Sequence, residues 1–308
     1  MWSKYGNYIL LQLVVLIFGL TGPLGKMIDA NEDVIVFYRL LFAVIGILVY
    51  FKISKYKIDR SKKVLQETWF IGVIVGVHWL TFFGAIKASN VSVALICFSS
   101  STLFSAILEP LYFKRKVILY EVILGLAIIV GLYFLVKDPN KPFFQSQYAL
   151  GMVLSVFSAL LASWFTVMNA VLVRQGRRAK NISFLTLVFA FIPVLIYLPI
   201  ANGTHLLSAL SIDGMSFIYI SILGLLCTSF AYLVSIDVMK EISPFSVTIS
   251  VMLEPIYSII LAVIIWPDSE KMQPTFYIGA ACILGIIALN AIFKFIAKRK
   301  LRISQPIL

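Results

Sequence analysis

The residue best suited to chemistry is Glu254, which precedes Pro255 near the middle of a long apolar segment. If that segment spans a bilayer, a carboxylate at this depth costs several kcal/mol unless it is protonated, paired or wetted. We therefore expect Glu254 to face the protein interior. Its carboxyl could bind substrate or a coupling proton. Alternatively, Glu254 ties neighbouring helices together, helped by Pro255, which frees a backbone carbonyl one turn earlier.

A second set of polar and amphipathic side chains lies at mid-depth in other apolar segments. His78 and Trp79 are at the midpoint of the third segment, and Trp164 is in the sixth. The run Ser99-Ser100-Ser101-Thr102 covers a full helical turn, so its hydroxyls would point in every direction. We expect these residues to line a central cavity in which the two indoles could stack on a substrate.

Each of these residues also has a plainer interpretation. The indoles could pack in the core or face lipid, and this alternative fits Trp164 better than Trp79. His78 could be a hydrogen-bonded core histidine. In the Ser99 to Thr102 turn, some members would be close-packing small residues, while one or two line the path.

Two basic residues, Arg39 and Lys26, lie near the outer ends of their apolar segments, with Asp29, Glu32 and Asp33 close by. Long basic side chains at such positions pair locally or extend their charged ends to the interface. We expect this structural role for both. Attraction of anionic substrates is the second interpretation.

The composition is that of an integral membrane protein. Apolar residues make up 61% of the chain and charged residues 13%, whereas soluble domains contain roughly 45–50% apolar residues. The net charge of +12 comes from short basic clusters between apolar segments, so we expect an anionic cytoplasmic leaflet, and no nucleic acid, as partner. The three cysteines lie within apolar segments without CxxC spacing. The sequence thus indicates no disulfide framework, no metal site and no cofactor.

The apolar segments predict an all-α protein with ten transmembrane helices. About 20 residues of helix cross a hydrocarbon core of roughly 30 Å, and lipid cannot satisfy the backbone of open strands. The first segment is longer than the apolar region of a signal peptide and is not followed by a cleavage site. The predicted spans are 8–27, 33–53, 66–87, 90–113, 117–137, 147–173, 181–201, 214–239, 242–266 and 274–296.

Basic residues are distributed unequally between the two predicted sides of the membrane. The side that holds the N-terminus carries 20 Lys and Arg residues and the opposite side carries 5, with Arg39 inside the second span. Cytoplasmic loops carry the excess of Lys and Arg. We therefore predict a multi-pass protein of the cell (inner) membrane with both termini cytoplasmic.

The chain contains an internal repeat. Lys87 matches Lys240 and Ser105 matches Ser258, at a shift of 153 residues. Pairing the two Leu-Glu-Pro triplets instead requires a shift of 145 and removes the other matches. Because each copy holds an odd number of helices, the second copy must enter the membrane inverted. We predict two inverted five-helix repeats, 1–140 and 141–308, an arrangement that recurs in transporters.

Two glycine pairs, Gly125 with Gly131 and Gly279 with Gly285, recur at a shift of 154 residues. Small residues allow helices to approach closely. We interpret these glycines as a helix-packing signature in the fifth and tenth helices, and those helices could also form the face of a homodimer.

Four short motifs together resemble the EamA-like ten-helix permeases of the drug/metabolite transporter superfamily. They are the stretch from Phe18 to Lys26, Tyr38-Arg39, Ala85-Ile86-Lys87 and Leu253-Glu254-Pro255. The resemblance covers essentially the whole chain, but Ser101-Thr102 occupies the place that the repeat assigns to Glu254-Pro255. It implies a permease for small metabolites or amino acids, often directed outward.

These observations predict a secondary transporter of small polar metabolites or amino acids that works by alternating access around a central cavity, with Glu254 as a site for proton coupling. The stretch from Gly22 to Lys26 lacks the spacing of a nucleotide-binding loop, which argues against a pump. The sequence holds no HExxH or GxSxG motif, so we expect no enzyme. A channel-like facilitator remains the alternative, and an intramembrane enzyme is the weaker one.

Overall fold

The computed structural model describes residues 2–119, 122–123, 126, 148–240, 250–251, 253–268, 278, 281–282 and 285. All regular secondary structure in these ranges is helical. Most of the predicted fifth and tenth spans lies outside them, and so do Gly125, Gly131 and Gly279. Gly285 is described, and among the described residues no atom is recorded within 4 Å of the place where its side chain would begin.

Seven helical stretches are long and apolar enough to cross a membrane, all within the described ranges. They follow the predicted spans 1 to 4 and 6 to 8, and one further helix lies in the ninth. The helices are α1 (Trp2–Gly19), α2 (Thr21–Met27), α3 (Glu32–Ile53), α4 (Lys62–Ala88), α5 (Val91–Phe98), α6 (Ser101–Tyr112), α8 (Ala149–Arg174), α9 (Ala179–Asn202), η2 (Gly203–His205), α10 (Leu206–Ala209), α11 (Gly214–Gly224), the π-helical turn η3 (Leu225–Phe230), α12 (Ala231–Asp237), η4 (Val238–Lys240) and α14 (Glu254–Ile265).

Side-chain hydrogen bonds account for where several helices begin. The Asn90 side chain accepts a hydrogen bond from the Val93 amide at 2.8 Å and caps α5. Asp213 accepts from the Met215 and Ser216 amides at 2.7 and 3.0 Å and caps α11. Such caps satisfy amide groups that have no partner in the first turn of a helix.

Three predicted spans are interrupted in the structure, and the first of them is divided into α1 and α2 at Leu20. The fourth span is divided into α5 and α6 at Ser99 and Ser100, and Ser99 Oγ donates back to the Leu95 carbonyl. Back-bonding of this kind bends helices. In the ninth span, α14 begins at Glu254 with Pro255 in its first turn, where proline costs no hydrogen bond. Glu254 therefore lies at a helix N-terminus and not in the middle of a continuous helix.

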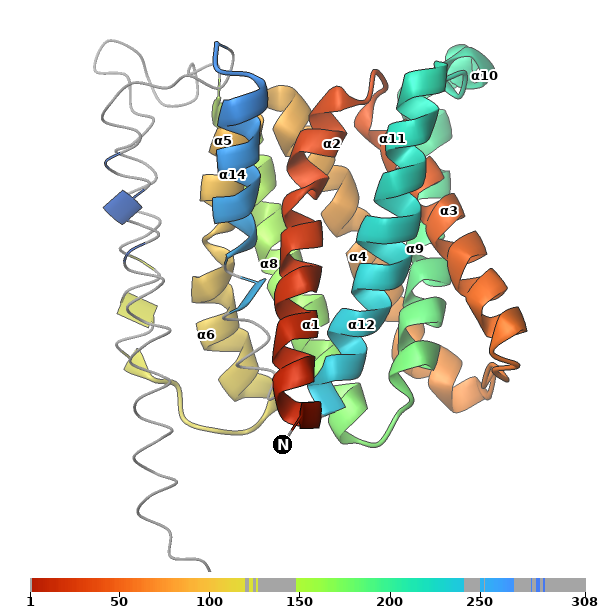
Figure 1. Ribbon diagram of the computed structural model, residues 1–308, viewed down its shortest axis with the longest axis vertical. Helices are drawn as coiled ribbons and strands as arrows, with labels where there is room; N and C mark the ends of the chain where they lie inside the picture. Colours follow the sequence, from red (N-terminus) through yellow and green to blue (C-terminus); the bar gives the residue numbers. More distant parts are fainter. Residues whose placement is uncertain are drawn as a thin grey trace, which may run out of the picture.

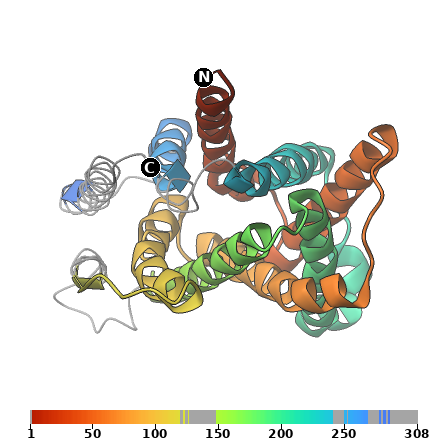
Figure 2. The same cartoon turned by 90° about the horizontal axis from the view of Figure 1, so that it is seen from below.

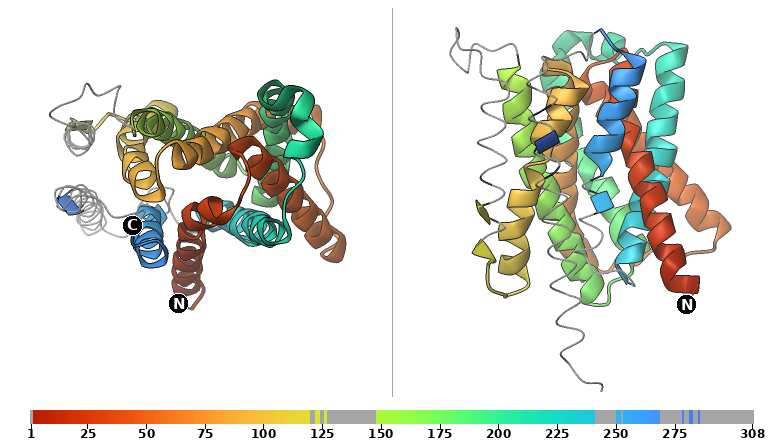
Figure 3. Two further views of the ribbon diagram at one scale, coloured as in Figure 1. Left: turned by 90° about the horizontal axis from the view of Figure 1, so that it is seen from above. Right: turned by 60° about the vertical axis from the view of Figure 1, so that its left-hand side comes forward.

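The described spans form a closed ring (Figures 1 and 2). Neighbours around this ring are α1, α14, the α5–α6 pair, α8, α4, α9, α3 and the α11–α12 span, which returns to α1. The C-terminal ends of α3, α6, α8 and α12 lie on the same side of the ring as the N-terminus, and α10 lies on the opposite side (Figure 1; Figure 3, right). The ring surrounds the space in which the candidate site lies.

Close approach of α4 and α9 depends on two glycines that the sequence interpretation passed over. A Cβ atom at Gly72 would lie 2.6 Å from the Thr186 carbonyl oxygen, and one at Gly76 would collide with the Ala190 backbone. Glycines four residues apart are a known signature of close helix packing in membranes. They bring the backbones of α4 and α9 together beside the central space.

Polar contacts join helices at the end that holds α10. Lys87 Nζ donates to the Ile28 carbonyl at 2.8 Å, and the Asp29 amide donates to Ser216 Oγ at 3.0 Å. These bonds tie the connection between α2 and α3 to α4 on one side and to α11 on the other.

A second polar cluster lies at the end that holds the N-terminus. Asn181 Oδ1 accepts from the Asp59 amide at 2.8 Å, and Asn181 Nδ2 donates to the Asp59 carbonyl at 2.9 Å. Arg177 and Glu67 form an ion pair at 2.7 Å. The cluster joins the connection between α3 and α4 to the first turn of α9, and α4 to the connection between α8 and α9.

Candidate functional site

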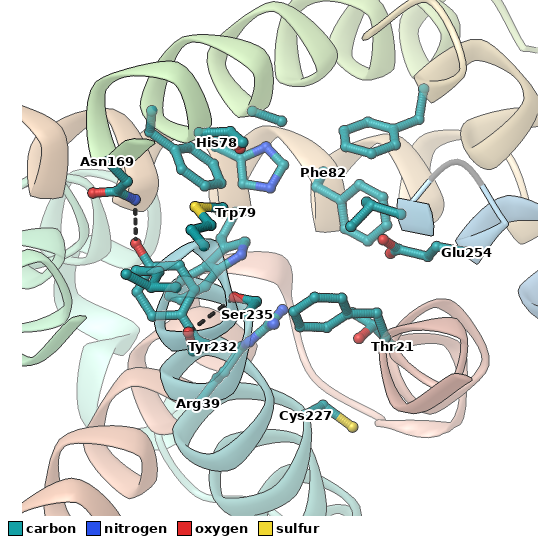
Figure 4. Close-up of a pocket in the computed structure, with 18 residues that line it drawn as sticks. Thr21, Arg39, His78, Trp79, Phe82, Asn169, Cys227, Tyr232, Ser235 and Glu254 are labelled. Atoms are coloured by element: carbon teal, nitrogen blue, oxygen red, sulfur yellow. Dashed lines mark hydrogen bonds between the residues drawn. The ribbon is translucent and has the colours of Figure 1, made fainter. Parts of the chain in front are cut away.

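A cavity with about 130 Å³ of space for water lies inside the ring (Figure 4). This is room for several water molecules or a small solute, since one water needs roughly 10–15 Å³ by the same measure. Its walls are mostly aromatic and hold one basic side chain, Arg39, and one acidic side chain, Glu254. The lining residues are Phe18, Thr21, Arg39, His78, Trp79, Phe82, Phe98, Ala162, Phe165, Thr166, Asn169, Cys227, Tyr232, Ser235, Ile236, Met239, Val251 and Glu254.

Arg39 is the central cation of this site. It lies in the third turn of α3 on the helix face that is buried, and its side chain is only 3% exposed. Its guanidinium carbon is 4.3 Å from the centroid of the Trp79 ring and 5.4 Å from that of Phe83. Stacking of a guanidinium on aromatic faces contributes a favourable cation–π interaction. Two aromatic rings of α4 therefore hold the Arg39 side chain.

The π-helical turn η3 supplies a further contact to Arg39. Arg39 Nε donates to Thr228 Oγ1 at 2.7 Å, and Thr228 Oγ1 donates to the Leu223 carbonyl five residues earlier, at 2.8 Å. At Gly224, a Cβ atom would lie 2.9 Å from the Arg39 carbonyl oxygen. The missing side chain thus lets α11 approach α3. Arg39 Nη1 is buried and has no hydrogen-bond partner among the described residues.

Glu254 reaches the cavity from the N-terminus of α14. The amide groups at a helix N-terminus favour negative charge. Figure 4 shows the carboxyl of Glu254 and the guanidinium of Arg39 directed toward the same space. No ion pair between them is formed in the part of the chain that is described. Glu254 thus faces the interior, as the sequence predicted.

His78 and Trp79 also line the cavity, in agreement with their predicted position. His78 Nδ1 lies 2.8 Å from Ser158 Oγ and 3.0 Å from the Ser158 carbonyl oxygen. Its ring packs against the rings of Phe82 and Phe165, with centroids 6.0 and 5.3 Å away. His78 therefore combines both predicted roles, since it is a wall residue and its Nδ1 is fully engaged by α8.

A buried polar chain extends from the cavity into the helices behind it. Asn169 Nδ2 donates to the Tyr232 hydroxyl at 3.1 Å, and this hydroxyl lies 3.3 Å from Thr186 Oγ1. Asn169 Oδ1 is buried without a partner among the described residues. The chain links α8, α12 and α9 and leaves one acceptor available beside the cavity.

Trp164 does not line the cavity, contrary to the prediction. Its Nε1 donates to the Tyr112 hydroxyl at 2.7 Å, and its ring meets that of Phe70 at 5.6 Å. Successive helix residues point in directions about 100° apart, so the next residue, Phe165, lines the cavity. Trp164 stabilises the packing of α8 against α4 and α6.

The Ser99-Ser100-Ser101-Thr102 turn likewise lies outside the cavity lining. Thr102 Oγ1 donates to the Ser99 carbonyl, and Ser163 Oγ on α8 donates to the Ser101 carbonyl at 2.9 Å. Ser99, Ser100 and Ser101 are buried. These small residues form the interruption between α5 and α6 and pack it against α8, which was the alternative interpretation of the turn.

Sequence reasoning missed Arg39, Thr21 and Asn169 as cavity residues. We expected Arg39 to pair locally near a helix end, but the nearby acids have other contacts: Asp33 accepts a hydrogen bond from Asn202. Lys26 keeps the predicted peripheral position, over the ring of Trp266 at 4.7 Å. The signal for Arg39 was its place two turns inside an apolar helix, because charges at membrane depth face cavities or partners.

In the described ranges, no three His, Cys, Asp or Glu side chains are grouped so that they could hold a metal ion. Cys97 and Cys227 are buried thiols in α5 and η3, and Cys227 lines the cavity. The site can therefore offer a cation, a carboxyl, hydroxyls, an amide and aromatic faces.

Comparisons with known proteins agree with this arrangement of helices. The chain is 21% identical over 302 residues to the uncharacterized transporter YxxF of Bacillus subtilis (strain 168), covering 94% of this chain and 91% of that protein. A solved crystal structure shares the fold, with a TM-score of 0.62 and 15% identity over 95% of this chain and 98% of the other. The model of the EamA-like transporter family matches residues 6–137 and 149–292. The chain belongs to the EamA-like transporter family.

Proposed function

We propose that the protein is a secondary transporter that moves small polar metabolites or amino acids by alternating access, with the cavity as its substrate site. The observation that carries this proposal is the position of a buried Arg39 and of Glu254 in one aromatic cavity inside the helix ring. Charged groups inside a membrane protein mark pathways for substrates and ions. Membership of a transporter family supports the same conclusion.

Two inverted repeats, residues 1–140 and 141–308, form the halves of this transporter. Helix α6 begins at Ser101 and α14 begins at Glu254, each after an interruption, and each has 12 residues. The two starting points differ by the 153 residues that relate Ser105 to Ser258. The Ser99 to Thr102 turn thus becomes the counterpart of the chain around Glu254.

The packing of the helices supports the same relation. Helix α1 packs on α12 and α14, and its counterpart α8 packs on α4 and α6. Helix α3 packs on its own counterpart α9. Exchanging each helix with its counterpart, α1 with α8, α3 with α9, α4 with α12 and α6 with α14, leaves these contacts unchanged. A pseudo-twofold axis in the membrane plane has this property, and it is the symmetry of inverted-repeat transporters.

We place both termini in the cytoplasm and the protein in the cell inner membrane. The connection between α3 and α4, the end of α6 and the connection between α8 and α9 lie on the N-terminal side of the ring (Figure 1). These segments and the helix turns next to them carry most of the basic residues in the described ranges. The positive-inside rule assigns this side to the cytoplasm.

Glu254 is the residue that we assign to proton coupling. It is the one acidic side chain among the described residues that line the cavity, and it shares the cavity with Arg39. A carboxyl that is reached in turn from both sides could carry a proton with each cycle. A channel would not need this alternation.

Counterflow in proteoliposomes tests the proposal. Purified protein is reconstituted, the vesicles are loaded with one candidate metabolite or amino acid, and uptake of the same labelled compound is followed. A carrier gives saturable, transient accumulation that depends on the internal compound. Downhill flux without saturation or counterflow would identify a channel and reject the carrier mechanism.

A further inference from the structure

We propose that Arg39 and Thr21 form an anion subsite in the cavity, and that it binds the carboxylate of a small organic acid with an apolar body. The inference rests on the proposed transport function, because it names the chemical class that the cavity takes. Its basis is a buried, incompletely paired guanidinium in the wall of a cavity that the buried hydroxyl of Thr21 also lines.

The hydrogen bonds of Arg39 leave part of its guanidinium available. Nε is engaged by Thr228 at 2.7 Å, while Nη1 is buried without a partner in the described part of the chain. A buried donor that is left unpaired is costly, and more so when it is charged. Arg39 has no acidic ion-pair partner among the described residues. An anion at Nη1 would remove this cost.

Thr21 supplies the second donor. Its Oγ1 is buried beside the Cys227 thiol, a weak acceptor, and has no hydrogen bond to an oxygen or nitrogen atom among the described residues. The Thr21 side chain lines the same cavity. It follows the interruption between α1 and α2, so it enters the cavity from another helix than Arg39. A hydroxyl can donate to a carboxylate oxygen. Arg39 and Thr21 thus line one cavity from different helices, and a charged guanidinium there favours a carboxylate over a neutral carbonyl.

The other walls define the body of the ligand. Phe18, Phe82, Phe98 and Phe165 line the cavity together with Trp79. A fully hydrated inorganic anion would lose its water against these rings without gaining new hydrogen bonds. An organic acid places its charge at Arg39 and its apolar part among the aromatic rings. The guanidinium fork is also well matched to a planar carboxylate.

Glu254 is the group that would oppose such a ligand. It is the acidic side chain of the cavity lining and faces the same space as Arg39. A carboxylate ligand and an ionised Glu254 would repel each other, so the ligand binds Arg39 when Glu254 holds a proton. In this arrangement Arg39 holds the carboxylate of the ligand and Glu254 holds the proton, and both residues line the same cavity.

Binding of phenylacetate to the purified full-length protein in detergent tests the subsite, with phenylacetamide as its neutral analogue. We expect phenylacetate to raise the temperature of unfolding in a saturable manner and phenylacetamide to have little effect. Loss of a charged hydrogen bond in Arg39→Gln should weaken binding about 10- to 100-fold, and Thr21→Val about 3- to 10-fold. Thr68→Val is the matched control, because the Thr68 hydroxyl bonds within α4, to the Val64 carbonyl at 2.8 Å.

Equal binding of the acid and the amide would overturn the proposal, and so would no saturable effect of phenylacetate. Unchanged binding in a folded Arg39→Gln or Thr21→Val variant would also overturn it. If Arg39→Gln does not fold, the acid and amide comparison and Thr21→Val still decide the question. Inorganic phosphate binding in place of phenylacetate would reject an organic acid.

Counterflow separates this inference from the transport function. If phenylacetate binds through Arg39 but no carboxylate shows counterflow, the subsite stands and the carrier mechanism fails. If a neutral or cationic compound shows counterflow while acid and amide bind alike, the carrier mechanism stands and the anion subsite fails.

Discussion

The guanidinium carbon of Arg39 lies 4.3 Å from the centroid of the Trp79 indole ring, and this contact joins α3 to α4 at the wall of the cavity. A desolvated cation–π contact contributes up to about 2 kcal/mol. The same indole packs against the Tyr232 ring, with centroids 6.5 Å apart. Trp79 therefore links the cation of the cavity to the polar chain behind it.

Replacing Trp79 with Phe should weaken substrate binding, because the smaller ring gives a weaker cation–π contact and holds Arg39 less firmly. A difference of about 1 kcal/mol corresponds to roughly a fivefold rise in the half-saturation concentration of counterflow. Trp164→Phe is the control, since Trp164 lies away from the cavity and bonds to Tyr112. Equal effects of the two substitutions would contradict the assigned role of Trp79.

Replacing Glu254 with Gln should remove the pH dependence of transport, since Gln retains hydrogen-bonding groups but cannot carry a transferable proton. The measurement is the initial rate against pH for native and variant protein reconstituted in equal amounts. Parallel curves would leave Glu254 as a structural residue that ties helices together.

The other Leu-Glu-Pro triplet, Leu108-Glu109-Pro110, offers a matched control for this experiment. Glu109 lies in α6, outside the cavity lining, and forms an ion pair with Arg115. Glu109→Gln should keep the native pH profile. If this variant also loses the pH dependence, the effect cannot be assigned to the cavity.

Replacing Gly76 with Ala should separate α4 from α9 and destabilise the protein, because the new methyl group collides with the Ala190 backbone. Overpacking of this kind costs typically 1–3 kcal/mol. Gly84→Ala on the same helix is the control, since its Cβ would meet the nearest atom, in Leu154, at an ordinary 3.5 Å. Thermal unfolding in detergent measures the stability of both variants. A similar fall in unfolding temperature in the two would refute the packing role of Gly76.

The sequence predicted most of the helical spans but only part of the site. Apolar length determines where a helix can cross the bilayer, so the ends of α3, α4, α8 and α9 lie close to the predicted limits. The side on which a residue faces depends on helix packing. Trp79 and Trp164 were both predicted at mid-depth, yet of the two only Trp79 lines the cavity.

Arg39 illustrates a second limit of sequence reasoning. Its distance from the helix start suggested local pairing with the acids that precede it. In the structure, Gly224 lets α11 approach α3, and Thr228 of the π-helical turn engages Arg39 Nε. Both contacts come from a segment about 190 residues away along the chain. Local spacing contains no information on such a partner.

Two exposed serines at opposite ends of the ring report the orientation of the protein in the membrane. Ser54 follows α3 on the N-terminal side, and Ser208 lies in α10 on the other side. In a cysteine-free background, Ser208→Cys should react in whole cells with a membrane-impermeant thiol reagent. Ser54→Cys should react only after the membrane is opened. The reverse pattern would reject cytoplasmic termini.

Replacing Asn181 with Ala should destabilise the polar cluster at the end of the ring that holds the N-terminus, because Asn181 bonds both the amide and the carbonyl of Asp59, at 2.8 and 2.9 Å. The substitution removes two part-buried hydrogen bonds, and a typical intramolecular hydrogen bond contributes about 0.5–1.5 kcal/mol. Ser183→Ala is the control on the same helix, since Ser183 Oγ bonds only to the Ala179 carbonyl, one turn earlier. We expect a clear fall in unfolding temperature for Asn181→Ala and little change for Ser183→Ala. An unchanged unfolding temperature in Asn181→Ala would mean that water replaces the lost bonds and that this side chain does not hold the two connections together.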